Sequence, residues 1–256
     1  MAAGRNYSGS HTEARPYDPL SRSVPNLEHP MTHNRTRPIR VLITAGPTHE
    51  PIDAVRYLAN RSSGRLGVEL ADAAADRGLQ TRLLIGPVPL RPRSPNIETH
   101  PFTTTADLQA LLAEHAEWAD LLVMAAAVAD YRPLKDLNGP TDKIRRTDSG
   151  LTLNLEPTPD LLAGVAATRR PGQVLVGFAL EPAERLEASA QDKLRRKGID
   201  FIVANPLETM DSQQITATLL ARDPAFAPEH TPGKVHKDHF AAWLLDLLEP
   251  IARDAP

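Results

Sequence analysis

The sequence predicts an α/β fold in which a mostly parallel sheet lies between two layers of helices. Two observations lead to this prediction. Short apolar runs rich in branched residues recur along the chain and stop at breakers, as the buried strands of parallel sheets do. Amphipathic patterns of helical length lie between these runs, and strands that alternate with helices form parallel sheets covered on both faces.

The first half of the chain predicts three strands and two helices. Apolar runs at 39–44 and 81–85 are each closed by a Gly-Pro pair. Between them, over 67–77, leucines and alanines recur on one face and a glycine follows, which is typical of a helix and its end. A second helical pattern over 107–118 precedes a third apolar run, at 121–128, which ends in alanines.

The second half continues the alternation. Strands are predicted at 173–178, 201–204 and 216–221, with a basic helix at 184–197 between the first two. An apolar helix at 239–248 closes the chain. Together these elements indicate a three-layer α/β/α, Rossmann-like arrangement.

Two segments depart from the alternation. Residues 131–150 combine prolines and glycines with clustered charges, so we expect a mobile flap there. Residues 151–156 alternate apolar and polar side chains, as a half-buried strand does. We expect them to form an antiparallel edge strand that a second copy of the chain pairs with, because exposed edges must be covered or paired.

Composition bounds the classes of function. The chain has 256 residues and a formal net charge of −3, which implies no general attraction to nucleic acid. It contains no cysteine, so a disulfide scaffold, a zinc–thiolate site and a catalytic thiol of its own are excluded, and any cysteine in its reaction must be a substrate. No run approaches the roughly 20 apolar residues of a membrane helix. We expect a cytoplasmic protein with no membrane partner, whose polar, proline-containing residues 1–37 form a disordered leader.

Ligands of open α/β sheets bind outside the carboxyl ends of the strands. After the first strand, residues 60–64 place an asparagine, serines and a glycine before a helix, where backbone N–H groups favour anions. The alternative is an ordinary helix N-cap at Ser62 or Ser63. The segment lacks the three-glycine dinucleotide fingerprint.

The third strand is followed by small residues and a carboxylate. The alanines at 125–127 allow a flat ring or a phosphate chain to approach the backbone, and Asp130 can hold a metal or a ribose hydroxyl. Alternatively, the alanines pack under a helix and Asp130 caps the next turn.

Two cationic clusters complete the candidates. Lys143, Arg145 and Arg146 lie in the predicted flap, where they suit a reaction that develops charge on phosphoryl oxygens, or else form a solvated charge run. Lys193 and Lys197 are one helical turn apart and share a face, which is either directed at a ligand or exposed to solvent.

Several uncommon strings occur in a consistent order from about residue 39 to the final helix. They are TAGPTHEPID at 44–53, VRYLANRSSGRLG at 55–67, AAAVADYRP at 125–133, KIRR at 143–146, PTPDLL at 157–162, VGFALE at 176–181, and 193–205. Together they resemble the phosphopantothenate–cysteine ligase family, also called phosphopantothenoylcysteine synthetase. The resemblance implies that 38–256 form a single nucleotide-binding ligase domain in a homodimer.

The resemblance implies a two-step ligation in coenzyme A biosynthesis. The carboxylate of 4′-phosphopantothenate attacks a nucleoside triphosphate, CTP rather than ATP, to give an acyl-nucleotide and pyrophosphate. The amine of cysteine then displaces the nucleotide. Joining two anions requires Mg²⁺ and cationic side chains, although the metal ligands are unknown.

The resemblance also assigns residues. Asn60 matches the asparagine that orients the acyl group, and Lys143 the flap lysine that stabilises charge. Implied nucleotide contacts are Ser62, Met124, Ala125, Ala126, Asp130, Lys143, Pro159, Asp160, Leu161, Leu162, Phe178, Lys193 and Lys197.

Many family members carry a flavin-binding decarboxylase fused before the ligase, and residues 1–37 are too short for such a domain, so we expect a separate protein to decarboxylate the product. The flap of this chain reads KIRR rather than an all-lysine run. Two alternatives are a nicotinamide-dependent reductase, opposed by the single glycine at Gly46-Pro47, and a nucleotide sensor without activity, opposed by the presence of Asn60 and Lys143.

Overall fold

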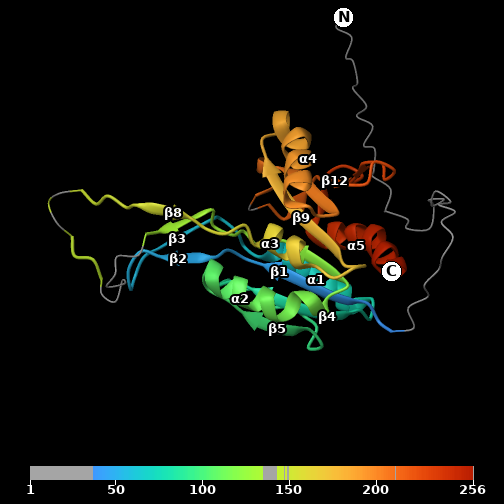
Figure 1. The fold of residues 1–256 in the computed structure, drawn as a ribbon, viewed down its shortest axis with the longest axis horizontal. Coiled ribbons are helices and arrows are strands. Elements are labelled where there is room, and N and C mark those ends of the chain that lie inside the picture. Colours follow the sequence, from blue (N-terminus) through green and yellow to red (C-terminus); the bar gives the residue numbers. More distant parts are fainter. Residues whose placement is uncertain (1–36, 135–142, 147, 149, 211, 256) are drawn as a thin grey trace, which may run out of the picture. The chain divides into compact units, whose positions relative to one another are not determined.

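A mostly parallel sheet forms the centre of the fold (Figure 1). The computed structural model describes residues 37–134, 143–146, 148, 150–210 and 212–255. Within them, eight strands follow the order β13-β12-β10-β9-β6-β1-β4-β5. Their bounds are β1 Arg40–Ala45, β4 Gln80–Ile85, β5 Glu98–Pro101, β6 Leu121–Met124, β9 Val174–Glu181, β10 Phe201–Pro206, β12 Thr218–Ala221 and β13 Glu229–His230. Neighbours from β10 to β5 are parallel, and β12 and β13 extend the sheet antiparallel, so the predicted sheet is confirmed.

Helices cover both faces of this sheet. They are α1 Arg65–Asp76, α2 Thr105–His115, α3 Leu161–Thr168, α4 Leu186–Lys197 and α5 Lys237–Asp254, with short 3-10 turns η1 Ala116–Trp118, η2 Ala183–Arg185 and η3 Leu207–Thr209. Val41 and Ile43 of β1 belong to the core under α1 and α5, whereas Leu42 belongs to the core under α2, α3 and α4. Because successive strand side chains point to opposite faces, the apolar run of β1 is buried on both sides. The three-layer prediction is confirmed.

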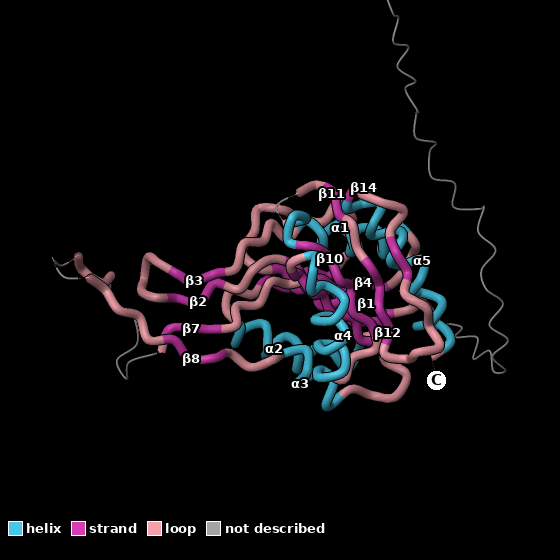
Figure 2. The backbone as a smooth tube through the Cα atoms, turned by 90° about the horizontal axis from the view of Figure 1, so that it is seen from above, coloured by secondary structure: helices cyan, strands magenta, loops and turns pink. Residues whose placement is uncertain are grey.

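Two ribbons project from the sheet and lie side by side in both views (Figure 1, Figure 2). One pairs β2 (His49–Pro51) with β3 (Tyr57–Ala59), and the other pairs β7 (Tyr131–Pro133) with β8 (Leu155–Pro157). We call these two ribbons the arm. A third ribbon pairs β11 (Gln214–Ile215) with β14 (Val235–His236), beside the start of α5.

The arm corrects the predicted edge strand at 151–156. Strand pairing involves only its last two residues and Pro157, and the partner is β7 rather than the central sheet. No face of the segment is buried in the single chain, since Leu151, Leu153 and Leu155 are all exposed. The sequence alternation therefore marks a ribbon whose apolar side chains have no cover within the described part of this chain.

Other boundaries also differ from prediction. The third strand ends at Met124 rather than at residue 128, the last predicted strand begins at Thr218, and the final helix runs on through Pro250 to Asp254. The predicted leader lies outside the described residues except for Arg37, whose guanidinium donates two hydrogen bonds of 2.8 Å to buried Asp120. Of the predicted flap, 135–142, 147 and 149 lie outside the described residues. None of the helices in the described part of the chain has the length and apolar character that a membrane span requires.

Candidate functional site

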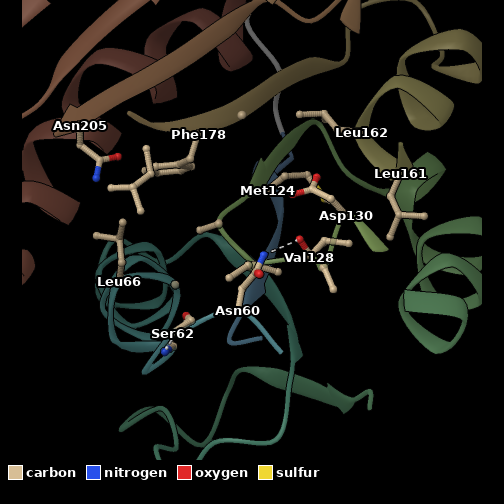
Figure 3. A pocket seen from close by; sticks show the side chains of 18 of the residues that line it. Asn60, Ser62, Leu66, Met124, Val128, Asp130, Leu161, Leu162, Phe178 and Asn205 are labelled. Atoms are coloured by element: carbon tan, nitrogen blue, oxygen red, sulfur yellow. Dashed lines mark hydrogen bonds between the residues drawn. The ribbon is translucent and has the colours of Figure 1, made fainter. Parts of the chain in front are cut away.

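A cleft with a volume of about 830 Å³ opens at the carboxyl ends of the central strands. This is where open parallel sheets bind ligands, and the volume suits a nucleotide-sized molecule. Its walls come from segments far apart in the sequence: the loop before α1, the loop after β6, the start of α3, and β9 (Figure 3).

Glycines at the start of α1 let the backbone of this helix lie close to the cleft and to β1. Gly64 has φ 72°, a left-handed conformation that favours glycine, and no side chain caps the helix there. A Cβ on Gly67 would meet the Cβ of Ala45 at 2.5 Å, so only glycine lets α1 pack this closely on β1. Ser62 Oγ accepts a hydrogen bond from Gly64 N at 3.3 Å, which places this hydroxyl beside the helix start. The alternative of a serine N-cap is therefore wrong, because Gly64 is the N-cap residue.

Asn60 links the two loops that form the cleft floor. Its Nδ2 donates a hydrogen bond of 2.9 Å to the carbonyl oxygen of Val128 (Figure 3). The side chain is otherwise exposed within the cleft. The amide is thus held at a defined orientation while remaining accessible to a ligand.

The chain beyond β6 leaves the sheet because its backbone finds other partners. Ala126 N donates to Thr44 Oγ1 at 3.0 Å, and Ala129 N donates to Thr48 Oγ1 at 2.9 Å. Both threonines are fully buried, so the two loops after β1 and β6 are fixed together. The alanines at 125–127 line the cleft rather than packing only under a helix, and the exposed Asp130 follows them on its rim.

The opposite wall begins at α3. Asp160 is its N-cap and accepts a hydrogen bond from Ala163 N at 3.1 Å. Leu161 and Leu162 are buried beneath the wall, and half-buried Phe178 of β9 supplies an aromatic face (Figure 3). This part of the cleft offers apolar contact of the kind that a base or sugar requires.

The two lysines of α4 are half-buried in this wall and paired with carboxylates. Lys197 Nζ donates to both oxygens of Asp160 at 2.6 Å, and Lys193 Nζ donates to Glu181 at 2.5 Å. Burial is the largest single effect and raises the pKa of Asp160, but the hydrogen bonds from Lys197 and Ala163 N and the charges of Lys197 and Arg196 together outweigh it, so the pKa is lowered. The hydrogen bond from Lys193 likewise lowers the pKa of Glu181. The reading of these lysines as simply solvent-facing is wrong.

Lys143 lies apart from the other predicted residues. It is exposed and is not among the residues that line the cleft. The neighbouring Ile144 is bound to the β2–β3 turn, because Ile144 N donates to Asp53 Oδ2 at 3.1 Å and its carbonyl accepts from Arg56 Nη2 at 2.9 Å. The hydrogen bond from Arg56 lowers the pKa of buried Asp53. Lys143 is therefore held on the arm.

Every residue that the resemblance assigns to the site, except Lys143, lines this one cleft, whereas the exposed flap candidates Arg145 and Arg146 do not. The residues brought together are Asn60, Ser62, Met124, Ala125, Ala126, Asp130, Pro159, Asp160, Leu161, Leu162, Phe178, Lys193 and Lys197. Sequence reasoning missed Arg61, Arg196, Asn205, Thr209 and Lys237, which also line it. A signal existed for Asn205, which directly follows the apolar run of β10 and so lies at a strand end.

No group of three or more histidine or acidic side chains placed to hold a metal occurs among the described residues. Asp130 is an exposed carboxylate in the cleft. Mg²⁺ is usually held by one or two carboxylates together with phosphate oxygens of the substrate, so this donor set fits a metal that arrives with a nucleotide.

Comparison with known proteins identifies relatives of this fold. The model of the DNA/pantothenate metabolism flavoprotein C-terminal domain matches residues 37–251. A protein named cysteine/cysteine sulfinic acid decarboxylase, from an unknown prokaryotic organism, is 43% identical over 169 residues, covering 66% of this chain and 46% of that protein. The coenzyme A biosynthesis bifunctional protein CoaBC of Escherichia coli strain K12 is 35% identical over 203 residues, covering 79% of this chain and 50% of that protein.

A solved structure shows the same architecture. The crystal structure of the C-terminal domain of a CoaBC protein aligns with a TM-score of 0.69 at 30% identity, covering 84% of this chain and 96% of that one. The chain spans about half the length of the curated relatives it matches.

Proposed function

This chain belongs to the family of the DNA/pantothenate metabolism flavoprotein C-terminal domain, and we propose that it is a phosphopantothenate–cysteine ligase of coenzyme A biosynthesis. The observation that carries the proposal is that all but one of the residues assigned through the family resemblance lie around a single cleft. The family match gives no support to the reductase alternative.

In the proposed first step, a carboxylate oxygen of 4′-phosphopantothenate attacks the α-phosphorus of CTP. The bond from that phosphorus to the oxygen bridging to the β-phosphate breaks, and pyrophosphate leaves with the electron pair. In the second step, the amine nitrogen of cysteine attacks the acyl carbon of the acyl-CMP. The bond from that carbon to the phosphate oxygen breaks, CMP leaves, and the nitrogen loses a proton to give the amide.

Asn60 is suited to orient the acyl group between these steps. Its amide is fixed on Val128 yet exposed in the cleft, and a neutral amide can both donate and accept without titrating. Because the group is held before the reaction, no reorganisation is needed as charge develops on the acyl oxygen.

The α3–α4 wall is suited to the nucleoside. Phe178 offers the base an apolar face, while Lys193 and Lys197 exchange their carboxylate partners for phosphate or ribose oxygens. The residues of this wall determine the preference for CTP over ATP. Mg²⁺, when bound, supplies positive charge to the phosphates, and Asp130 is the side chain that we propose to hold it.

We propose that the protein acts as a homodimer joined through the arm. Most of the exposed large apolar side chains of the described residues cluster on it, namely Val55, Tyr57, Tyr131, Leu134, Ile144, Leu151, Leu153 and Leu155. An exposed apolar patch of this kind favours burial against a partner. Lys143, held on the same arm, then reaches the cleft of the second copy, where its charge stabilises the phosphates in the first step.

The test is to mix the purified protein with 4′-phosphopantothenate, cysteine and either CTP or ATP, and to follow pyrophosphate release. We expect release with CTP, dependent on phosphopantothenate. The product is a carboxylic acid that a decarboxylase would consume. Release with neither triphosphate would contradict the proposal.

A further inference from the structure

The arm holds a fully buried carboxylate, although it projects from the sheet. This is Asp53, in the turn between β2 and β3, whose side chain has no exposed surface. Its two oxygens have different partners. Oδ1 accepts hydrogen bonds of 2.8 Å from the N–H groups of Val55 and Arg56, which shape the turn. Oδ2 accepts from Arg56 Nε at 2.9 Å and from Ile144 N at 3.1 Å, so the second oxygen also reaches a segment far away in the sequence.

Both backbone polar groups of Ile144 are held in this way. Its N–H donates to Asp53, and its carbonyl oxygen accepts from Arg56 Nη2 at 2.9 Å. We call these two hydrogen bonds the Ile144 clamp. Ile144 lies in the chain between β7 and β8, so the clamp joins the two ribbons of the arm, which lie side by side in Figures 1 and 2.

The clamp acts on the residue before it in the sequence, Lys143. The carbonyl group of Lys143 and the N–H of Ile144 belong to one planar peptide unit, so holding the N–H also holds the backbone at Lys143. The lysine side chain is long and exposed, and its reach therefore starts from a fixed point. A charge that stabilises developing phosphoryl charge acts best when it is in place before the reaction.

The carboxylate is suited to this task at neutral pH. The hydrogen bond from the Arg56 side chain is the largest effect on Asp53 and holds its pKa below the ordinary value. The acceptor of the Ile144 N–H is therefore always charged, and hydrogen bonds to charged groups are the stronger ones.

We propose that Asp53 is a positioning residue for Lys143, because its carboxylate holds the Ile144 peptide and thereby places the lysine for the first step of the reaction. This inference rests on the proposed function, since it takes Lys143 to act on the phosphates of a triphosphate.

Hydrogen–deuterium exchange of the full chain without substrates tests the clamp independently of activity. Asp53→Ser keeps a short oxygen that can accept within the turn, but it has no second oxygen for Arg56 and Ile144. We expect the amide of Ile144 to exchange about 10-fold faster or more, as measured by mass spectrometry with fragmentation to single residues. Equal exchange in the variant and the unmodified protein would overturn the inference.

The rate of pyrophosphate release then tests the positioning role. Asp53→Ser should lower kcat about 10- to 100-fold with little change in the KM for CTP, because misplacing a catalytic group affects the transition state. In a Lys143→Ala background, Asp53→Ser should cause no further loss. A purely structural role predicts the same fold loss in both backgrounds, and that result would refute the positioning of Lys143.

Asp72→Ser is the matched control. Asp72 of α1 is also buried, and one of its oxygens accepts from Arg93 N at 2.8 Å and Ser94 N at 3.2 Å while the other accepts from Arg93 Nε at 3.3 Å. It does not line the cleft. Asp72→Ser should leave both the exchange of Ile144 and the kcat unchanged, and an equal loss of kcat there would show that general destabilisation is the cause.

Failure of the inference and failure of the proposed function give different results. If the unmodified protein releases no pyrophosphate with either triphosphate, the function fails, whatever the exchange of Ile144 shows. If it releases pyrophosphate and Asp53→Ser matches its kcat, the inference alone fails. Should Asp53→Ser not fold, Asp53→Asn, which keeps the shape and removes the charge, must show the same dependence on Lys143.

Discussion

The side-chain amide of Asn60 donates a hydrogen bond of 2.9 Å to the backbone carbonyl of Val128. This contact joins the loop before α1 to the loop after β6, which are the two parts of the cleft floor. It places a neutral polar group where both loops face the ligand. The proposed reaction depends on this junction, because it fixes the amide that orients the acyl group.

Asn60→Asp should slow the second step of the reaction more than the first. A carboxylate cannot donate to Val128, and its negative charge opposes the charge that develops on the acyl oxygen. We expect the acyl-nucleotide to accumulate, as detected by mass spectrometry after acid quenching. Asn96→Asp, at an exposed position outside the cleft, is the control and should turn over normally. An Asn60→Asp enzyme with normal turnover and no intermediate would refute the assignment.

Lys143→Ala should reduce the rate of pyrophosphate release by about 100-fold or more, which is the scale for loss of one preorganised charge-stabilising donor. The fold should be unaffected because the side chain is exposed.

Mixing Lys143→Ala with Asn60→Ala chains determines which subunit the lysine serves. If Lys143 acts in the cleft of the second copy, one site of each mixed dimer has both residues, and activity returns. If the lysine acts in its own chain, no site is complete and the mixture stays inactive. The latter result would contradict the proposed role of the arm.

Leu153→Asp should weaken the dimer. The side chain is 41% exposed on the arm in the single chain, and a buried unpaired carboxylate at an interface is strongly unfavourable. Light scattering coupled to size-exclusion chromatography should show a shift from dimer to monomer at micromolar concentration. Leu207→Asp, at an apolar residue of similar exposure (39%) away from the arm, should stay dimeric. If both variants remain dimeric, the interface lies elsewhere on the chain.

Asp120 should make stability depend on pH in acid. Burial raises its pKa, but hydrogen bonds from Arg37, Arg40 and Arg170 outweigh that effect and lower the pKa below its unfolded value. A carboxylate with a lowered folded-state pKa contributes stability above its unfolded pKa of about 3.9, and that stability is lost as pH falls further. Asp120→Asn should lower the unfolding free energy at pH 7 by about 1.5–3 kcal/mol, because it removes the charge-assisted hydrogen bonds that the partly exposed Arg37, Arg40 and Arg170 donate to this carboxylate.

Chemical denaturation at pH 7 and pH 3 checks this prediction. The difference in unfolding free energy between Asp120→Asn and the unmodified protein should be smaller at pH 3. An equal difference at both values would show that the carboxylate is not the source of the pH dependence.

Apolar periodicity predicted the central elements because burial dictates it. The strands β1 and β4 have near-continuous apolar patterns, and the helix α1 has apolar residues on one face. The apolar side chains of these elements are buried as expected. β5 was missed because Glu98–Pro101 contains no large aliphatic residue and lies at the sheet edge. The third strand was extended too far because alanines are apolar, whereas its end is set by the buried hydroxyl of Thr44.

The site was predictable where strand ends meet. The topology brings Asn60, Asp130 and Phe178 together at the carboxyl ends of the strands. Asn60 follows β3, Asp130 lies in the segment after β6, and Phe178 lies in the second half of β9. The placement of Lys143 depends on Asp53, which contacts Ile144 across 91 positions of sequence, and no local pattern indicates such a contact. Lys237 was missed because a lysine at a helix start gives no local sign that tertiary packing will bury it.

The proposed function requires that the cleft activate a carboxylate with a triphosphate. The most direct measurement incubates the protein with 4′-phosphopantothenate and CTP without cysteine, at enzyme concentrations comparable to substrate. We predict a phosphopantothenoyl-CMP intermediate and an equal amount of pyrophosphate, with the intermediate consumed when cysteine is added. Absence of both, with CTP recovered intact and the same result with ATP, would contradict the account.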